Sequence, residues 1–210
     1  MVWWKKLIFT ICTLALTFAL GFSVLSLAFS KLTEQDTLRP FVRNLAAQQG
    51  LTESEFEQQF ERIYEAKFSC GGVLGCMSNP PDDGLGAVLI SRVGHDFFSQ
   101  SAGYSVVVAL IGAIGILLCA ETWSGRLRGL GIPAFVAGLN IGLQPIVEAA
   151  AVRGAPAEAG QYVQPLLDTV FKTFTIYYSI ILVAGIALSI AGFILLKHER
   201  KNEPVTTGGL

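Results

Sequence analysis

Three polar side chains interrupt an otherwise apolar segment at intervals of four residues: Asn140, Gln144 and Glu148. Steps of four keep side chains near one face of an α-helix, because each step overshoots a full turn by only about 40°. Amides and a carboxylate in such a row can hydrogen-bond to neighbouring helices or line a water-filled path through a membrane. We favour the packing role and keep a small pore or transporter as the alternative. Pro145 removes one backbone donor beside them and predicts a kink.

The rest of the chain contains few residue types that suit catalysis. It has two histidines, His95 and His198, and His95 precedes Asp96. Adjacent residues of a helix point in different directions, so we expect no acid–base pair there. The spacings of nucleotide-binding, hydrolase and metalloprotease motifs are missing, and a net charge of −1 with no basic stripe argues against nucleic acid. We therefore predict that the protein is not an enzyme, with no catalytic or metal-binding residues, no cofactor and no nucleic-acid partner.

Cys70 and Cys76 lie close together in a glycine-rich stretch that permits a tight turn. Two such cysteines outside the cytoplasm predict a disulfide. The alternative, half of a metal site, needs two further ligands. Cys12 and Cys119 lie in apolar runs near the opposite side of the predicted membrane and cannot supply them.

The composition points to a membrane protein. Hydrophobic residues make up 52% of the chain and charged residues only 15%, against about 25% charged in a soluble domain. A helix needs about 20 apolar residues to cross a bilayer. The third of the four predicted spans is the weakest, because its charge-free part is short. The predicted spans are residues 7–29, 102–120, 132–152 and 173–196.

The distribution of Lys and Arg predicts the orientation. Four crossings place all three basic segments on one side, which the positive-inside rule makes cytoplasmic. These segments are 1–6, 121–131 and 197–210. Residues 30–101 and 153–172 are then extracytoplasmic loops. We predict a multi-pass protein of the cell membrane with both termini in the cytoplasm.

The first span has a second interpretation. The small residues before Lys31 resemble a signal-peptide cleavage site. We favour a retained anchor, because the apolar run exceeds the usual length of a signal core.

The first outer segment, residues 30–101, carries ten acidic and six basic residues, a net charge of −4. Its apolar spacing predicts two amphipathic helices, the second beginning with a capping box of Thr52 and Glu55. We favour a hairpin in which the two apolar stripes bury each other, and the alternative is a stripe that binds a protein partner. The stripe of the second helix consists of Phe56, Phe60, Ile63, Tyr64 and Phe68.

Small residues at four-residue spacing predict close helix packing in the last two spans. The pairs are Gly138 with Gly142 and Gly185 with Ser189. Such contacts can form within one chain or between copies of it.

The plan of four spans with a long first outer loop containing a cysteine pair resembles that of claudins and tetraspanins. The resemblance is one of topology only. The loop contains no tryptophan, so the claudin signature is missing, and the tetraspanin CCG motif is missing too. We assign no family and transfer no residues.

Together these patterns predict an all-α integral membrane protein: a four-transmembrane-helix bundle with a helical extracytoplasmic loop subdomain. We expect a non-enzymatic structural, accessory or assembly subunit in the lipid bilayer. It would bind a protein partner through the outer loop, as a homo-oligomer or with another membrane protein. The alternative is a small pore or transporter lined by the polar face of the third span.

Overall fold

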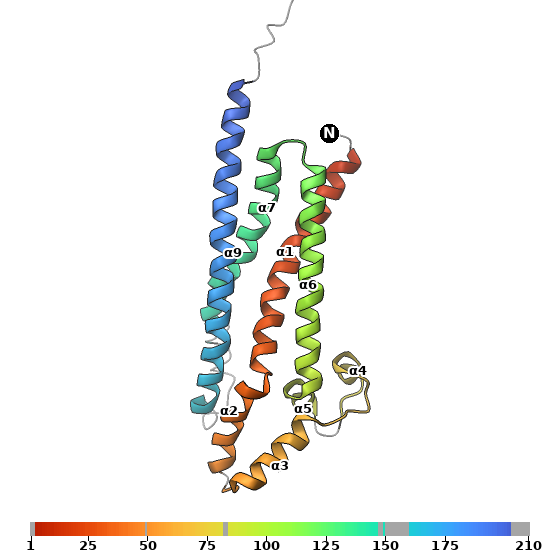
Figure 1. Cartoon of the computed structure of the whole chain (residues 1–210), viewed down its shortest axis with the longest axis vertical. Helices are drawn as coiled ribbons and strands as arrows, with labels where there is room; N and C mark the ends of the chain where they lie inside the picture. The colour runs from red at the N-terminus through yellow and green to blue at the C-terminus, as the bar shows by residue number, and fades with distance from the viewer. Residues whose placement is uncertain (1–2, 49, 82–83, 147–148, 150–159, 203–210) are drawn as a thin grey trace, which may run out of the picture. The chain divides into compact units, whose positions relative to one another are not determined.

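The structure, a computed structural model, describes residues 3–48, 50–81, 84–146, 149 and 160–202 (Figure 1). All regular elements within these residues are helices and none is a strand, which confirms the predicted all-α class. In chain order they are α1 (Trp3–Leu32), α2 (Gln35–Gln48), α3 (Glu53–Tyr64), α4 (Val73–Ser78), α5 (Gly84–Ile90), α6 (Arg92–Cys119), α7 (Trp123–Gly138), the 3₁₀-helix η1 (Leu139–Leu143) and α9 (Gly160–Asn202).

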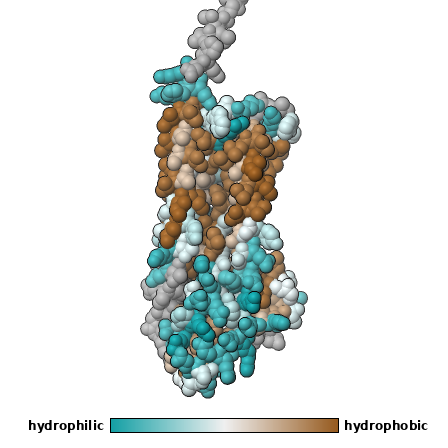
Figure 2. Space-filling view, in the orientation of Figure 1, coloured by the Kyte–Doolittle hydropathy of each residue, from teal (hydrophilic) through white to brown (hydrophobic). Residues whose placement is uncertain are grey.

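Four stretches of the described chain are long and apolar enough to cross a membrane, as predicted. Figure 2 shows hydrophobic side chains gathered over the long helices and hydrophilic ones over α2 and α3. Many large apolar side chains of the long helices are exposed, which suits contact with lipid. The protein is thus of the multi-pass membrane type by helix length and composition. The four stretches are Trp3–Leu32, Arg92–Cys119, Trp123–Ile146 and Val170–Glu199.

Each of the four long helices begins earlier than the apolar run that predicted it. α6 begins at Arg92, and α7 begins at Trp123, inside the segment expected to be a loop. The Thr122 side chain accepts a hydrogen bond from the Gly125 N–H at 3.1 Å and so caps α7. Helical hydrogen bonding continues through polar residues that a search for apolar runs excludes.

Ser91 separates α5 from α6. The Ser91 hydroxyl donates to the Val88 carbonyl at 2.7 Å and is buried. A side-chain bond to a nearby carbonyl competes with the backbone bond of a continuing helix. The chain therefore bends between α5 and α6.

The third apolar stretch changes its helical form near the middle. α7 ends at Gly138 and η1 follows it. Pro145 cannot donate to the carbonyl of Ile141, and its ring crowds that carbonyl. This 3₁₀ turn departs from the α-helical geometry assumed at Asn140, and it lies just before Pro145, where a kink was predicted.

The chain divides into two compact units. The first contains Met1–Gly21, Val106–Ile141 and Tyr177–Leu210, and the second contains Phe22–Ser105 and Gly142–Ile176.

In the first unit, α7 and α9 approach each other at glycines. A Cβ atom on Gly138 would lie 2.6 Å from the Leu182 Cα, and one on Gly131 would lie 2.6 Å from the Ser189 nitrogen. A Cβ on Gly185 would overlap backbone atoms of Phe135. Only hydrogen fits at these three positions, so the two backbones are in van der Waals contact.

In the second unit, α2 and α3 form a helical hairpin, and α4 packs against α5. The hairpin has its own core of Leu38, Ala46, Phe56, Phe60 and Tyr64. A second small core contains Val73, Cys76 and Val88.

Candidate interaction surfaces

The aromatic stripe of α3 forms the core of the hairpin. Three residues of the stripe are buried against α2: Phe56, Phe60 and Tyr64. The ring centroids of Phe56 and Phe60 lie 5.6 Å apart, and those of Phe60 and Tyr64 lie 5.8 Å apart. These three side chains already contact their own chain, which matches the favoured hairpin interpretation of the stripe. Ile63 lies at the edge and is 47% exposed.

Polar contacts hold the two helices of the hairpin in register. Arg39 of α2 forms an ion pair with Glu57 of α3, and Arg43 pairs with Glu53 at 2.5 Å. At the start of α3, the Glu55 carboxylate accepts hydrogen bonds from the Thr52 hydroxyl at 2.6 Å and from the Thr52 N–H at 3.0 Å. These bonds hold the pKa of Glu55 below its ordinary value.

An apolar groove of about 260 Å³ runs beside the hairpin core. Its walls come from α2 and α3, and Ile90 at the end of α5 closes one side. Exposed Ile63 lies at its margin.

Phe68, predicted to extend the aromatic stripe, lies beyond the end of α3. The helix stops at Tyr64, and Phe68 packs against the core of Val73, Cys76 and Val88. The predicted stripe is thus one residue too long, because contacts with α4 and α5 draw the chain away from the helix axis.

The predicted disulfide between Cys70 and Cys76 is present and joins α4 to the chain that precedes it. α4 buries Val73 and Cys76 on one side. On its other side Leu74 and Met77 are 67% and 63% exposed. We call these two residues the α4 apolar pair.

The α4 apolar pair was not among the residues predicted from the sequence to form a site. A usable signal was present: two large apolar residues, three positions apart, lie within a polar loop beside a cysteine pair. Three positions apart places two side chains on one face of a helix. Only the structure shows that this face points away from the core.

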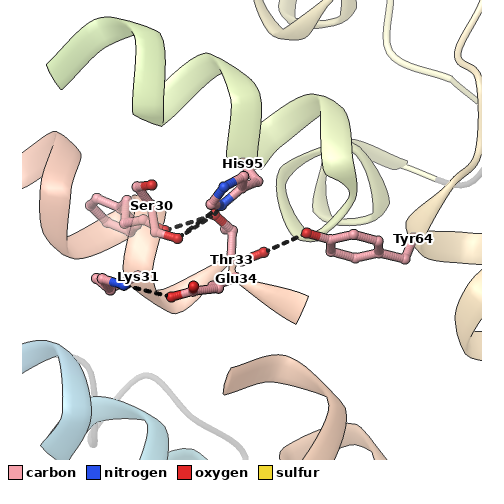
Figure 3. A network of polar contacts seen from close by, with 7 residues as sticks. Ser30, Lys31, Thr33, Glu34, Tyr64 and His95 are labelled. Atoms are coloured by element: carbon pink, nitrogen blue, oxygen red, sulfur yellow. Dashed lines mark hydrogen bonds and ion pairs between the residues drawn. The ribbon is translucent and has the colours of Figure 1, made fainter. Parts of the chain in front are cut away.

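A polar network joins the ends of α1, α3 and α6 in the second unit (Figure 3). The His95 Nδ1 lies 3.0 Å from the Ser30 carbonyl, which can only accept, so this nitrogen donates. The Tyr64 hydroxyl donates to the Thr33 carbonyl at 3.2 Å, and burial raises the pKa of Tyr64. Figure 3 also shows the ion pair of Lys31 with Glu34. These bonds satisfy carbonyls near the end of α1 and connect it to α3 and to the start of α6.

The polar residues of the third stretch have different surroundings. The Asn140 side chain packs against Gly21 of α1, where a Cβ would lie 3.4 Å from its amide nitrogen. The Gln144 side-chain oxygen accepts a hydrogen bond from the Thr175 hydroxyl at 2.8 Å. Glu148 lies outside the described residues. The described contacts are those of the favoured packing role, and the pore stays a prediction.

Three of the four small residues predicted to pack closely lie at the contact between α7 and α9, and one does not. Gly138, Gly185 and Ser189 take part in the close approach of α7 and α9, whereas a Cβ on Gly142 would meet nothing within 4 Å. The partner position on α7 is Gly131, seven residues before Gly138. Two turns of helix return a residue to the same face, so this pair also follows one seam.

No protein-family model matches the chain, and searches of curated proteins and of solved structures find no match. Any functional conclusion therefore rests on the residues of this chain.

Proposed function

We propose that this protein is a non-enzymatic, multi-pass membrane protein that acts as an accessory or assembly subunit. Its segment 30–101 lies outside the cytoplasm and binds a second protein, with the α4 apolar pair as the central contact. The exposure of these two side chains on a helix tied down by a disulfide is the observation that carries the proposal.

Exposed apolar side chains on a short, covalently restrained helix suit protein recognition. Burying a leucine or methionine completely contributes about 1.5–3 kcal/mol. The disulfide between Cys70 and Cys76 limits the conformations of α4 before binding, so less entropy is lost when a partner docks. A rigid apolar anchor of this kind is typical of the central residues of an interface.

Charge supports a protein partner over an anionic lipid surface. The segment 30–101 has a net charge of −4, and the hairpin exposes several glutamates. Anionic headgroups would repel such a surface, while a protein with a neutral or basic face would not. We expect the partner to bring an apolar contact surrounded by basic residues.

The orientation forms part of the same proposal. All three clusters of Lys and Arg flank the four apolar stretches on the side that we assign to the cytoplasm. A disulfide belongs in an oxidising compartment, which is the side that we assign to residues 30–101.

The test is purification from native membranes in mild detergent, followed by mass analysis of the intact particle. The single chain weighs 22.5 kDa, so a second protein or further copies add a defined mass. In a double variant, Leu74→Glu with Met77→Glu, we expect the partner to be lost. Removing about 3 kcal/mol of apolar burial weakens binding about a hundredfold.

The matched control is the double variant Ser54→Glu with Gln58→Glu, which adds the same two charges at exposed positions of α3. This variant should keep the partner. A particle of single-chain mass in the unsubstituted protein would refute the proposal, as would a partner retained by the double variant. Reporter fusions that place Cys70 in the cytoplasm would refute the orientation.

A further inference from the structure

One end of the first unit collects positive charge. It contains the start of α1, the turn between α6 and α7, and the end of α9. The Ser124 hydroxyl of α7 donates to the Glu199 carboxylate of α9 at 2.5 Å, and Gly129 of α7 lies against the Phe9 ring of α1. Residues 3–6, 120–128 and 197–202 carry seven Lys and Arg but two acidic residues, a net charge of 7 − 2 = +5. One acid, Glu199, is already engaged by Ser124.

Within this end, Arg128 has an unusual environment. Its Cγ lies against Gly192 of α9, where a Cβ would be 2.6 Å away, and its guanidinium lies 4.6 Å above the Phe193 ring. Its Nε is buried and finds no hydrogen-bond acceptor in the part of the chain that the structure describes. A charged group with an unpaired buried donor is costly, and Arg128 as a whole is only half-buried, so an acceptor that reaches the rest of its guanidinium from outside the chain would stabilise it.

The other arginine of the same turn is different. The Arg126 Nε donates to the Ala120 carbonyl at 3.2 Å, and its guanidinium lies 4.8 Å above the Trp123 ring. Arg126 and Arg128 carry equal charge. Of the two, only Arg128 has a buried donor without a hydrogen-bond acceptor.

The surroundings of Arg128 indicate what that acceptor is. Phe193, Ile190 and Ile194 leave an exposed apolar surface on α9, and Lys197 lies one turn beyond Phe193 on the same face. The tryptophans at this end, Trp3, Trp4 and Trp123, are exposed, as indoles are at a membrane surface. An anion at this position would contact two cations, Arg128 and Lys197, beside the exposed apolar face of α9.

We propose that Arg128 and Lys197 bind the phosphate of an anionic phospholipid in the cytoplasmic leaflet, with the acyl chains lying along α9 beside Phe193. Arg binds phosphate oxygens through a planar fork of donors, and Lys197 adds a second charge. This site is distinct from the outer-loop surface and rests on the proposed membrane insertion, but on no partner protein.

The test is native mass spectrometry of the purified full-length protein in mild detergent. Three probes are titrated separately: phosphatidylglycerol, phosphatidylcholine with the same acyl chains, and inorganic phosphate. We expect phosphatidylglycerol to bind more tightly than phosphatidylcholine, and inorganic phosphate not to displace it. Arg128→Gln should weaken phosphatidylglycerol binding about tenfold, as expected for a lost hydrogen bond to a charged group.

Two variants keep the test decisive if Arg128→Gln is poorly folded. Lys197→Gln changes an exposed side chain and should weaken the same lipid, and Arg128→Lys should bind less tightly than arginine because it lacks the fork. Arg126→Gln removes the same charge at the same end and should bind phosphatidylglycerol as the unsubstituted chain does.

Three results would overturn the proposal. Equal losses in the Arg126 and Arg128 variants would show a diffuse effect of charge. Equal binding of both lipids would show contact with acyl chains alone. Displacement by inorganic phosphate would show an anion site without lipid specificity. None of these results bears on the outer-loop partner, whose presence is read from the mass of the intact particle.

Discussion

Replacing Gly185 with alanine tests the contact between α7 and α9 most directly. A Cβ at this position would overlap the Phe135 backbone nitrogen and lie 2.8 Å from the Ala134 carbonyl carbon. These are backbone atoms, so no side chain can rotate to make room, and the helices must separate. Overpacking of this kind costs about 1–3 kcal/mol.

Alanine also favours a helix by about 1 kcal/mol over glycine, which opposes the steric cost. A control variant must therefore gain the same helix propensity from a glycine-to-alanine change, at a position where the new Cβ overlaps no other atom. Gly103→Ala in α6 meets that need, because a Cβ there would have no atom within 4 Å. The difference between the two variants isolates the steric cost of about 1–3 kcal/mol, up to about a hundredfold in the unfolding equilibrium.

The assay is reversible unfolding in mixed detergent micelles, with helicity measured as the denaturing detergent increases. We expect the free energy of unfolding of Gly185→Ala to fall below that of Gly103→Ala by the stated amount. Equal free energies in the two variants would refute the close approach of α7 and α9.

Three further predictions concern single polar contacts. The pKa of Glu55 is lowered by its bonds from Thr52, so the stabilisation of α3 is complete above the unfolded pKa of about 4.3 and is lost as pH falls through the lower folded value. Helicity measured between pH 6 and pH 3 should show this loss in the unsubstituted chain, and Glu55→Gln should lack it. Tyr178→Phe removes a 3.1 Å bond to the Gly21 carbonyl and should lower the free energy of unfolding in micelles by about 0.6 kcal/mol; no change would mean that the bond contributes nothing. Tyr64→Phe should lower the free energy of thermal unfolding by about 1 kcal/mol, because the Thr33 carbonyl at the end of α1 loses its donor. A variant that is more stable than the unsubstituted chain would contradict this prediction.

Much of the fold follows from local patterns. Apolar length predicted the four long helices, because a helix satisfies its own backbone in lipid. The spacing of Phe56, Phe60 and Tyr64 predicted an amphipathic helix, and two near cysteines with glycines between them predicted the disulfide. Each of these depends on residues within a few turns of one another.

Predictions that needed the path of the chain were less complete. α-Helical spacing was assumed for Asn140 and Gln144, with a kink predicted at Pro145, and the structure has a 3₁₀ turn over Leu139–Leu143. Gly142 was paired with Gly138, although the residue that meets α9 together with Gly138 is Gly131. The sequence shows which residues are small, but it does not show which face of a helix meets a neighbour.

By itself, the sequence determined the helical class, the number of apolar stretches and the cysteine pair, because hydrophobicity and short-range geometry act along the chain. Only the tertiary structure decided that Leu74 and Met77 point away from their core and that the Arg128 Nε is buried without an acceptor. Exposure and hydrogen-bond satisfaction depend on residues distant in sequence, such as Val88 beneath α4 and Phe193 beneath Arg128. Side-chain type alone does not contain that information.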